Sequence, residues 1–330
     1  MQIQDNSIQS SFLEQVRKRL HPNISFADEL AEILNISRDS AYRRIRGETV
    51  LSLEEVRIVC NHFGVSLDAL LSPTAEMVSF HHRVVNHKTF PLDKWLQAIL
   101  GNIEMLSGFA GEKELVYATP DVPFFHFFNH PVMSPFKMFV YMKTILHYPE
   151  LTNKKYNAEY APKELLSVGR KIWDKYSALP GTEIWSQNAY TVTLRQIEYY
   201  HECGLFEDPQ QALQLCDAYL EIIKTVDGYA SEGKKIPGGG EFNMYKNELW
   251  VTDTTVLFKM GERRITFITH NTMNLLNTTQ ESFCRHTEDY LSNLLQRSTI
   301  LSPVGERDRI KYFNSIEATV NQLKNRIKSS

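Results

Sequence analysis

The stretch ADELAEILNISRDSAYRRIRGE runs from Ala27 to Glu48, and SLEEVRIVCNHFGVSLDALL runs from Ser52 to Leu71. In both stretches, apolar residues recur at the three- and four-residue spacing of one helix face. The polar turn Asn35-Ile36-Ser37 interrupts this spacing, and Ile36 is predicted to fill the core between two crossing helices. The two stretches therefore predict short helices joined by tight turns.

Serines mark where these helices begin. Three are candidate N-caps, because a serine hydroxyl accepts a hydrogen bond from a free amide of the first turn: Ser25, Ser37 and Ser52. Asp28 follows Ser25, and Glu55 follows Ser52, at the three-residue spacing of a capping box. Ser37 is expected to start a helix from Arg38 to Arg46, which Gly47 ends.

Two further helices complete the pattern. The first carries Phe12, Val16 and Leu20 on one face, and the last is a short helix from Leu67 to Leu71. The segment from Phe12 to Leu71 is thus predicted to be an all-helical domain of about five short helices.

As a set, these positions resemble the Cro/C1-type, phage-repressor-like helix-turn-helix family. The resemblance covers about residues 12–72 and implies a lambda-repressor-like fold that binds double-stranded DNA and regulates transcription. It rests on Leu30-Ala31, Leu34, Ile36-Ser37, Gly47, Ser52-Leu53, the run from Phe63 to Asp68, and Leu70-Leu71.

The resemblance implies that the helix from Arg38 to Arg46 lies in the major groove. Carried over position by position, four residues are candidates for contacting base edges, because arginine can hold guanine and aspartate can accept from cytosine: Arg38, Asp39, Ser40 and Arg43. Tyr42, Arg44 and Arg46 are candidates for phosphate contacts. Ser25 and Ser37 stand at helix N-termini, where backbone amides can point at phosphates.

One pair of residues departs from the family pattern. The family usually has an apolar residue at the position of Arg44 and an acidic residue at the position of Ile45, and here the two characters are effectively exchanged. Ala41 and Ile45 are then expected to supply the core contact of a slightly rotated helix. An arginine-rich face that is only solvated, or a helix-turn-helix that binds a protein, is the alternative.

Composition sets the limits on the class of protein. The chain has 330 residues, of which 42% are hydrophobic and 23% charged, with a net charge of −3. These values predict a folded protein of two domains. No long apolar run and no signal pattern occurs, which predicts a cytoplasmic protein that does not enter a membrane. The four cysteines are far apart, which favours reduced thiols over disulfides or a zinc site.

The expected layout has three parts. Residues 1–74 form the helix-turn-helix domain, residues 75–89 a linker, and residues 90–330 a larger, mainly α domain with a small antiparallel β-sheet. Its predicted helices span about 91–108, 134–148, 162–178, 187–202, 208–226, 279–297 and 304–328.

The strand signal of the larger domain is confined to two places. One is Leu115–Ala118, and the other extends from Phe242 to about Leu276, with Met260-Gly261-Glu262 as a hairpin turn. Two or three antiparallel strands are therefore expected. Gly238-Gly239-Gly240 is predicted to be a flexible loop before a strand, because no Lys-Ser/Thr pair follows as in a phosphate loop.

The last predicted helix carries an apolar seam. Five residues follow the 3-4-3-4 spacing of a coiled coil: Phe313, Ile316, Val320, Leu323 and Ile327. One interpretation is a homodimer contact, since repressor-type domains bind paired half-sites. The other is a helix that packs on its own domain.

Side chains that suggest a ligand or a metal are few. The run from Phe124 to Phe128 either lines an apolar pocket or belongs to the core. His126 and His130 are four residues apart, but Pro131 argues against a helix that would turn both toward one metal. No catalytic residue, cofactor or metal site is predicted.

These observations predict a DNA-binding transcriptional regulator that acts as a dimer and is not an enzyme. Its C-terminal domain is expected to hold the subunits together and to respond to an unknown small-molecule or protein effector. Two alternatives stay open. One is an enzyme that the DNA-binding domain targets or controls, and the other is an interaction scaffold with a degenerate helix-turn-helix.

Overall fold

The computed structural model describes residues 8–17, 19–20, 24–65, 67, 78–248 and 251–329. The chain divides into two compact units, Met1–His81 and His82–Ser330, and each is described by itself. No helix within the described ranges combines the length and the apolar character needed to cross a membrane.

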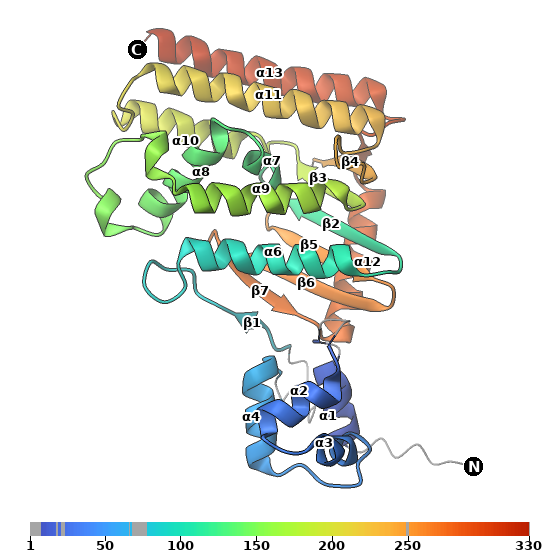
Figure 1. Cartoon of the computed structure of the whole chain (residues 1–330). Helices are drawn as coiled ribbons and strands as arrows, with labels where there is room; N and C mark the ends of the chain where they lie inside the picture. Colours follow the sequence, from blue (N-terminus) through green and yellow to red (C-terminus); the bar gives the residue numbers. More distant parts are fainter. Residues whose placement is uncertain are drawn as a thin grey trace. The chain divides into compact units, whose positions relative to one another are not determined.

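The first unit is a bundle of short helices. Its helices are α1 (Ile8–Arg17), α2 (Phe26–Leu34), α3 (Arg38–Ile45) and α4 (Leu53–Phe63) (Figure 1). Its core is formed mainly by Phe12, Leu13, Val16, Leu30, Ala41 and Val59. Ile36 and Ile45 pack against this core, as predicted. Most of the predicted last helix, Leu67–Leu71, lies outside the described residues.

Two of the three predicted caps form. The Ser37 hydroxyl accepts from the amide of Ser40 at 3.2 Å, and Ser52 forms the full capping box with Glu55. Ser25 precedes α2 but its side chain makes no capping bond, so the predicted box with Asp28 is wrong. Asp28 instead forms an ion pair with Arg38 at 2.8 Å, which turns its carboxylate toward α3.

The second unit is built on a mixed β-sheet. Its strands, within the described residues, lie in the order β1-β7-β6-β5-β2-β3-β4-β8. Their bounds are β1 His81–His82, β2 Lys113–Thr119, β3 Gly181–Ser186, β4 Phe242–Asn247, β5 Thr255–Met260, β6 Arg263–His270, β7 Asn274–Thr278 and β8 Thr299–Ile300. The sheet is therefore much larger than the two or three strands expected.

The centre of this sheet is parallel, which corrects the prediction of an antiparallel sheet. β2 pairs with β3, and β3 with β4, in parallel, because helical segments carry the chain back across the sheet between these strands. β5, β6 and β7 continue from β2 as an antiparallel meander, with the predicted hairpin turn at Gly261.

β3 is a central strand that the sequence pattern does not predict. Its sequence GTEIWS is short and holds Glu183 in the middle, whose side chain is 0% exposed. The carboxylate accepts hydrogen bonds from His126 (Nε2 to Oε1, 2.9 Å), from Trp185 (Nε1 to Oε2, 2.7 Å) and from the hydroxyl of Tyr176. These partners offset the loss of water around a buried charge.

Helices cover both faces of the sheet. Leu115 and Tyr117 of β2 face the large core, whereas Val116 and Ala118 pack on the opposite face with Leu291 of α12. α6 and α9 run side by side on the first face, and so do α11 and α13 (Figure 1). The bounds are α6 Leu92–Gly108, α7 Phe125–Phe128, α8 Met133–Val140, α9 Lys163–Ala178, α10 Thr191–Glu202, α11 Gln210–Glu232, α12 Glu281–Gln296 and α13 Glu306–Ser329.

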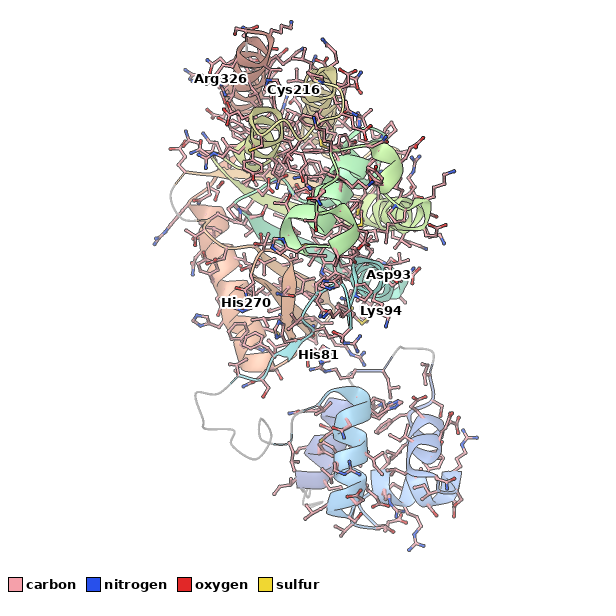
Figure 2. The ribbon with its side chains drawn as sticks, turned by 90° about the vertical axis from the view of Figure 1, so that its left-hand side faces the viewer. His81, Asp93, Lys94, Cys216, His270 and Arg326 are labelled. Atoms are coloured by element: carbon pink, nitrogen blue, oxygen red, sulfur yellow. The ribbon has the colours of Figure 1, made fainter. Side chains whose placement is uncertain are left out.

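The expected long helices are confirmed with adjusted ends. The expected helix over 134–148 is α8, which continues as a π-helical turn, η1 (Tyr141–Ile145), and the short helices η2 (Pro149–Leu151) and η3 (Ala158–Tyr160) follow it. α6 shows the amphipathic pattern behind these predictions. Its first turn carries Asp93 and Lys94 on the outside of the unit (Figure 2), whereas Trp95 and Leu96 are buried.

The apolar seam of α13 lies in the chain's own core. Val320 is 0% exposed and Leu323 is 1% exposed, and both belong to the cluster that α11 and the sheet share. Phe313, Ile316 and Ile327 are buried in the same cluster. These side chains correspond to the alternative of a helix packed on its own domain, and a dimer contact through them would require this unit to open.

The triple glycine before β4 is a tight turn rather than a flexible loop. A Cβ atom on Gly240 would lie 2.2 Å from the carbonyl oxygen of Leu179, and one on Gly238 would lie 2.2 Å from the Ser177 hydroxyl. The amide of Gly240 also donates to the Ser177 carbonyl at 3.0 Å. Glycine is required here because two backbones approach closely.

Candidate nucleic-acid interface

α3 presents one exposed face. Arg38, Asp39, Tyr42, Arg43 and Arg46 follow the spacing i, i+1, i+4, i+5, i+8, and all five are exposed. Ala41, on the opposite side of the helix, is 0% exposed and belongs to the core of this unit. The periodicity of the helix therefore gathers five of the predicted contact residues on a single surface, hereafter the α3 face.

The arginines of the α3 face have weak ion-pair partners in the free protein. Arg38 Nε lies 2.8 Å from Asp28, Arg46 Nε lies 2.9 Å from Glu48, and Arg43 Nε lies 3.8 Å from Glu48. All of these side chains are about half exposed, so each pair stabilises the protein by about 1 kcal/mol or less. The guanidinium groups can therefore exchange these carboxylates for phosphates at little expense of free energy.

Tyr42 adds an aromatic surface to the same face. The Arg38 guanidinium carbon lies 5.8 Å from the centre of the Tyr42 ring, within the range of a cation–π contact. The ring holds the arginine side chain over the helix. Fewer rotamers then have to be frozen when the guanidinium meets a base or phosphate.

Arg44 does not belong to the α3 face. Its Nε and Nη2 donate to Glu55 Oε1 at 3.1 and 2.8 Å, and its Nη1 donates to the Ser40 carbonyl at 3.2 Å. Burial alone raises the pKa of Glu55, but the bonds from Arg44 and from the Ser52 amide bring that pKa below its ordinary value. Arg44 therefore ties α3 to the first turn of α4, whereas a phosphate contact was predicted for it.

The two predicted serines stand at the start of α3. The hydroxyls of Ser37 and Ser40 lie 2.9 Å apart, and that of Ser37 also accepts the Ser40 amide. Ser40 is half-buried, so its hydroxyl is less accessible than the side chains of the α3 face. Ser37 is exposed, and as the N-cap it holds the first turn of α3 in place.

Gln9 is a positioning residue that no sequence motif marks. Its Nε2 donates to the carbonyls of Arg44 and Thr49 at 2.9 and 2.8 Å, and its Oε1 accepts from the amide of Leu51 at 2.8 Å. One side chain of α1 thereby fixes the end of α3 and the loop that leads to α4. Its partners are 35 to 42 residues away, and no local pattern marks such a contact.

The histidines considered for a metal have other partners. His126 bonds to Glu183 in the core of the second unit, and His130 Nε2 lies 3.0 Å from Glu221. No group of three or more metal-binding side chains occurs among the residues that the structure describes. Within the run 124–128, Phe125, Phe127 and Phe128 are core residues, and Phe124 and Phe125 also line a cavity.

Comparison with known proteins bears on the first unit. Residues 17–70 match the helix-turn-helix family, which confirms the Cro/C1-type resemblance for this segment of the chain. A search of curated proteins found no significant match, and a search of solved structures found none. The chain thus carries a segment of the kind that DNA-binding transcription regulators use.

Proposed function

We propose that this protein is a sequence-specific DNA-binding regulator of transcription, and that the α3 face enters the major groove. The proposal rests on the α3 face. Three exposed arginines, a tyrosine and an aspartate project there from one side of a helix, within residues 17–70 that match the helix-turn-helix family. A major groove about 12 Å wide admits such a helix.

The residues of the α3 face have distinct proposed roles. Arg38 and Asp39, at the start of the helix, contact base edges, because that end of a recognition helix lies closest to the bases. Arg43 follows Asp39 one turn later on the same face and is proposed to contact a base edge as well. Arg46 and Tyr42 contact phosphates. Arg44 and Gln9 act indirectly, since their hydrogen bonds hold α3 against α4 and the following loop.

We also propose that two copies bind paired half-sites, as repressor-type domains do. Because the residues of the α13 seam are buried within one chain, we propose that other residues join the two copies. We propose no catalytic role. A protein-binding helix-turn-helix is the alternative that the following experiment separates.

The test is recovery of sheared genomic DNA by the purified full-length protein, followed by sequencing. Arg38→Ala/Arg43→Ala removes two exposed arginines, whose side chains are 61% and 57% exposed. Arg170→Ala/Arg285→Ala is the matched control, because these arginines are 62% and 56% exposed, form surface ion pairs and lie in the second unit. Both variants change the net charge equally.

The proposal predicts a paired-half-site motif enriched by the wild type and by the control variant, and lost with Arg38→Ala/Arg43→Ala. Equal enrichment by all three proteins would place the DNA contacts elsewhere. Enrichment by none of them would favour the protein-binding alternative.

A further inference from the structure

A cavity of about 390 Å³ lies within the His82–Ser330 unit, in the range of small-molecule sites. Its lining begins at the carboxyl end of β2, where Thr119 leads into Pro120, Asp121 and Val122. The carboxyl ends of parallel strands are where α/β sheets commonly bind ligands. α6, α7, α8, η1, α10 and β5 to β7 supply the other walls, so the cavity is a product of the tertiary fold.

Aromatic side chains form part of the cavity wall. The centre of the Trp95 ring lies 5.7 Å from that of Phe124 and 6.3 Å from that of Tyr141. The Tyr117 ring lies 6.5 Å from Phe124. Phe125, Phe258 and Phe267 also line the cavity. Aromatic faces attract organic cations, and they also bury the apolar body of a ligand.

Lys137 is the cationic residue among the lining residues. Its side chain is 2% exposed, and its Nζ donates to Thr193 Oγ1 at 2.9 Å and to Gln196 Oε1 at 2.8 Å. The same Nζ lies 4.3 Å from the centre of the Phe127 ring. The protein itself thus satisfies most of the bonding capacity of this ammonium group.

Asp121 also lines the cavity, and its carboxylate accepts fewer hydrogen bonds from the protein than the Lys137 ammonium group donates. Its Oδ1 accepts from the amide of Val122 at 2.7 Å, and it forms no ion pair with any residue that the structure describes. Burial raises the pKa of Asp121, and the charge of Lys137 offsets part of that rise. Asp253, a second acid, also lines the cavity and is exposed.

We propose that this cavity binds a small organic amine with an aromatic or branched apolar body, whose ammonium group meets Asp121. The lining holds two acids and one lysine, and that lysine already has Thr193 and Gln196 as partners. A cationic ligand therefore completes the charge balance, whereas an anion would lie beside an unpaired carboxylate. That this amine acts as the effector of a transcription regulator rests on the proposed function.

Three probes of similar shape separate the charge classes. Tryptamine carries an ammonium group, tryptophol a neutral hydroxyl and indole-3-propionate a carboxylate, and each is titrated into the full-length protein by calorimetry. Tryptamine is expected to bind at least about tenfold more tightly than the other two, because a hydrogen bond to a charged group is stronger than a neutral one.

Two variants place the probe in the cavity. Asp121→Asn is nearly isosteric and its amide oxygen can still accept from Val122, so the expected result is unchanged melting and at least about tenfold weaker tryptamine binding. Val192→Trp fills the lining from α10 at a residue that is 37% exposed, and should block all three probes. Asp174→Asn, an exposed acid of α9, is the control and should leave tryptamine binding unchanged.

The following results would contradict the proposed amine site. Tighter binding of indole-3-propionate than of tryptamine would reverse the proposed charge class, and equal binding of the three probes would refute the role of Asp121. Binding that survives Val192→Trp, or no binding of any probe, would overturn the site.

The DNA experiment separates this proposal from the proposed function. Tryptamine is expected to change the affinity of the wild type for its enriched DNA motif, and to leave that of Asp121→Asn unchanged. Amine binding without DNA enrichment would support the cavity and refute the regulator. DNA enrichment without amine binding would support the regulator and refute the cavity as an amine site.

Discussion

At the scale of single residues, Arg44 and Arg46 are two positions apart but have different roles. Arg44→Ala leaves the half-buried Glu55 without its main partner, so the free energy of unfolding is expected to fall by about 1–2 kcal/mol. Arg46→Ala should leave that free energy unchanged, because its ion pair with Glu48 is exposed.

The salt dependence of DNA binding distinguishes the same pair. Arg46→Ala is expected to lower the slope of log affinity against log salt concentration by about 1, since one phosphate contact is lost. Arg44→Ala should keep the wild-type slope. Chemical unfolding and DNA titrations at several salt concentrations measure both quantities, and a reduced slope for Arg44→Ala alone would contradict these roles.

Lys235 gives a pH dependence to stability. Burial lowers its pKa from 10.5 to about 8, an effect that Glu183 partly offsets, and its Nζ has no hydrogen-bond partner among the described residues. Between these two pH values the unfolded chain binds more protons than the folded one, so stability rises with pH. Below about pH 8 the full penalty of the buried charge is present.

Lys235→Met removes this dependence. From about pH 7 to about pH 10.5, the wild type should gain up to about 3 kcal/mol of unfolding free energy relative to Lys235→Met. Urea unfolding across this range measures the difference. Lys234→Met, at the exposed neighbouring position, should follow the wild type, and a wild-type curve parallel to that of Lys235→Met would contradict the burial of the charge.

Local residue contacts could be predicted and distant ones could not. The caps at Ser37 and Ser52 depend on partners three residues away, and both form. Gln9 depends on a loop about 40 residues away, and Glu183 on His126, 57 residues before it. From the sequence alone, a glutamate in a short strand is predicted to be exposed to solvent, because the partners that satisfy its charge in the core are distant in the chain.

At the scale of elements, α13 is expected to be essential to the fold of its own unit. Val320→Glu/Leu323→Glu places two charges in a packed core, so the second unit should lose its tertiary structure. Circular dichroism and light scattering measure this. Asn321→Glu/Asn325→Glu, on the exposed side of the same helix, should remain folded. A folded monomer from a dimeric wild type would instead restore the seam as a dimer contact.

The turn before β4 offers a second test at this scale. Gly240→Ala forces a Cβ against the Leu179 carbonyl, and the free energy of unfolding should fall by about 1–3 kcal/mol. Gly101→Ala in α6 is the control, because nothing lies within 4 Å of its Cβ position and alanine favours a helix. Chemical denaturation compares the two, and equal stability of both variants would contradict the close approach.

The helices could be predicted because their 3.6-residue pattern is local, and α6, α9, α12 and α13 fall close to their expected ranges. The sheet could not, because its parallel pairing joins strands about 60 residues apart in the chain. β3 also lacks the alternation of a half-buried strand, since both of its faces are covered.

At the scale of the whole molecule, the sequence predicted the class of the first unit and left the second unassigned. Five of the eight predicted contact residues share the α3 face, while Ser37 caps the helix, Ser40 is half-buried and Arg44 turns toward α4. The aromatic run from Phe124 to Phe128 left an apolar pocket open as one interpretation, and Phe124 and Phe125 do line the cavity of the second unit. The remaining walls could not be predicted, because residues between 95 and 275 meet there only after folding.

The most direct measurement of the central claim is the affinity for an enriched duplex and for a scrambled duplex of equal length. It compares the wild type, Arg38→Ala/Arg43→Ala and Arg170→Ala/Arg285→Ala at one salt concentration. The α3 face predicts that Arg38→Ala/Arg43→Ala loses at least about 100-fold in affinity for the enriched duplex and little for the scrambled one, while the control matches the wild type. An equal loss by both variants, or an unchanged preference for the enriched duplex, would contradict recognition by the α3 face.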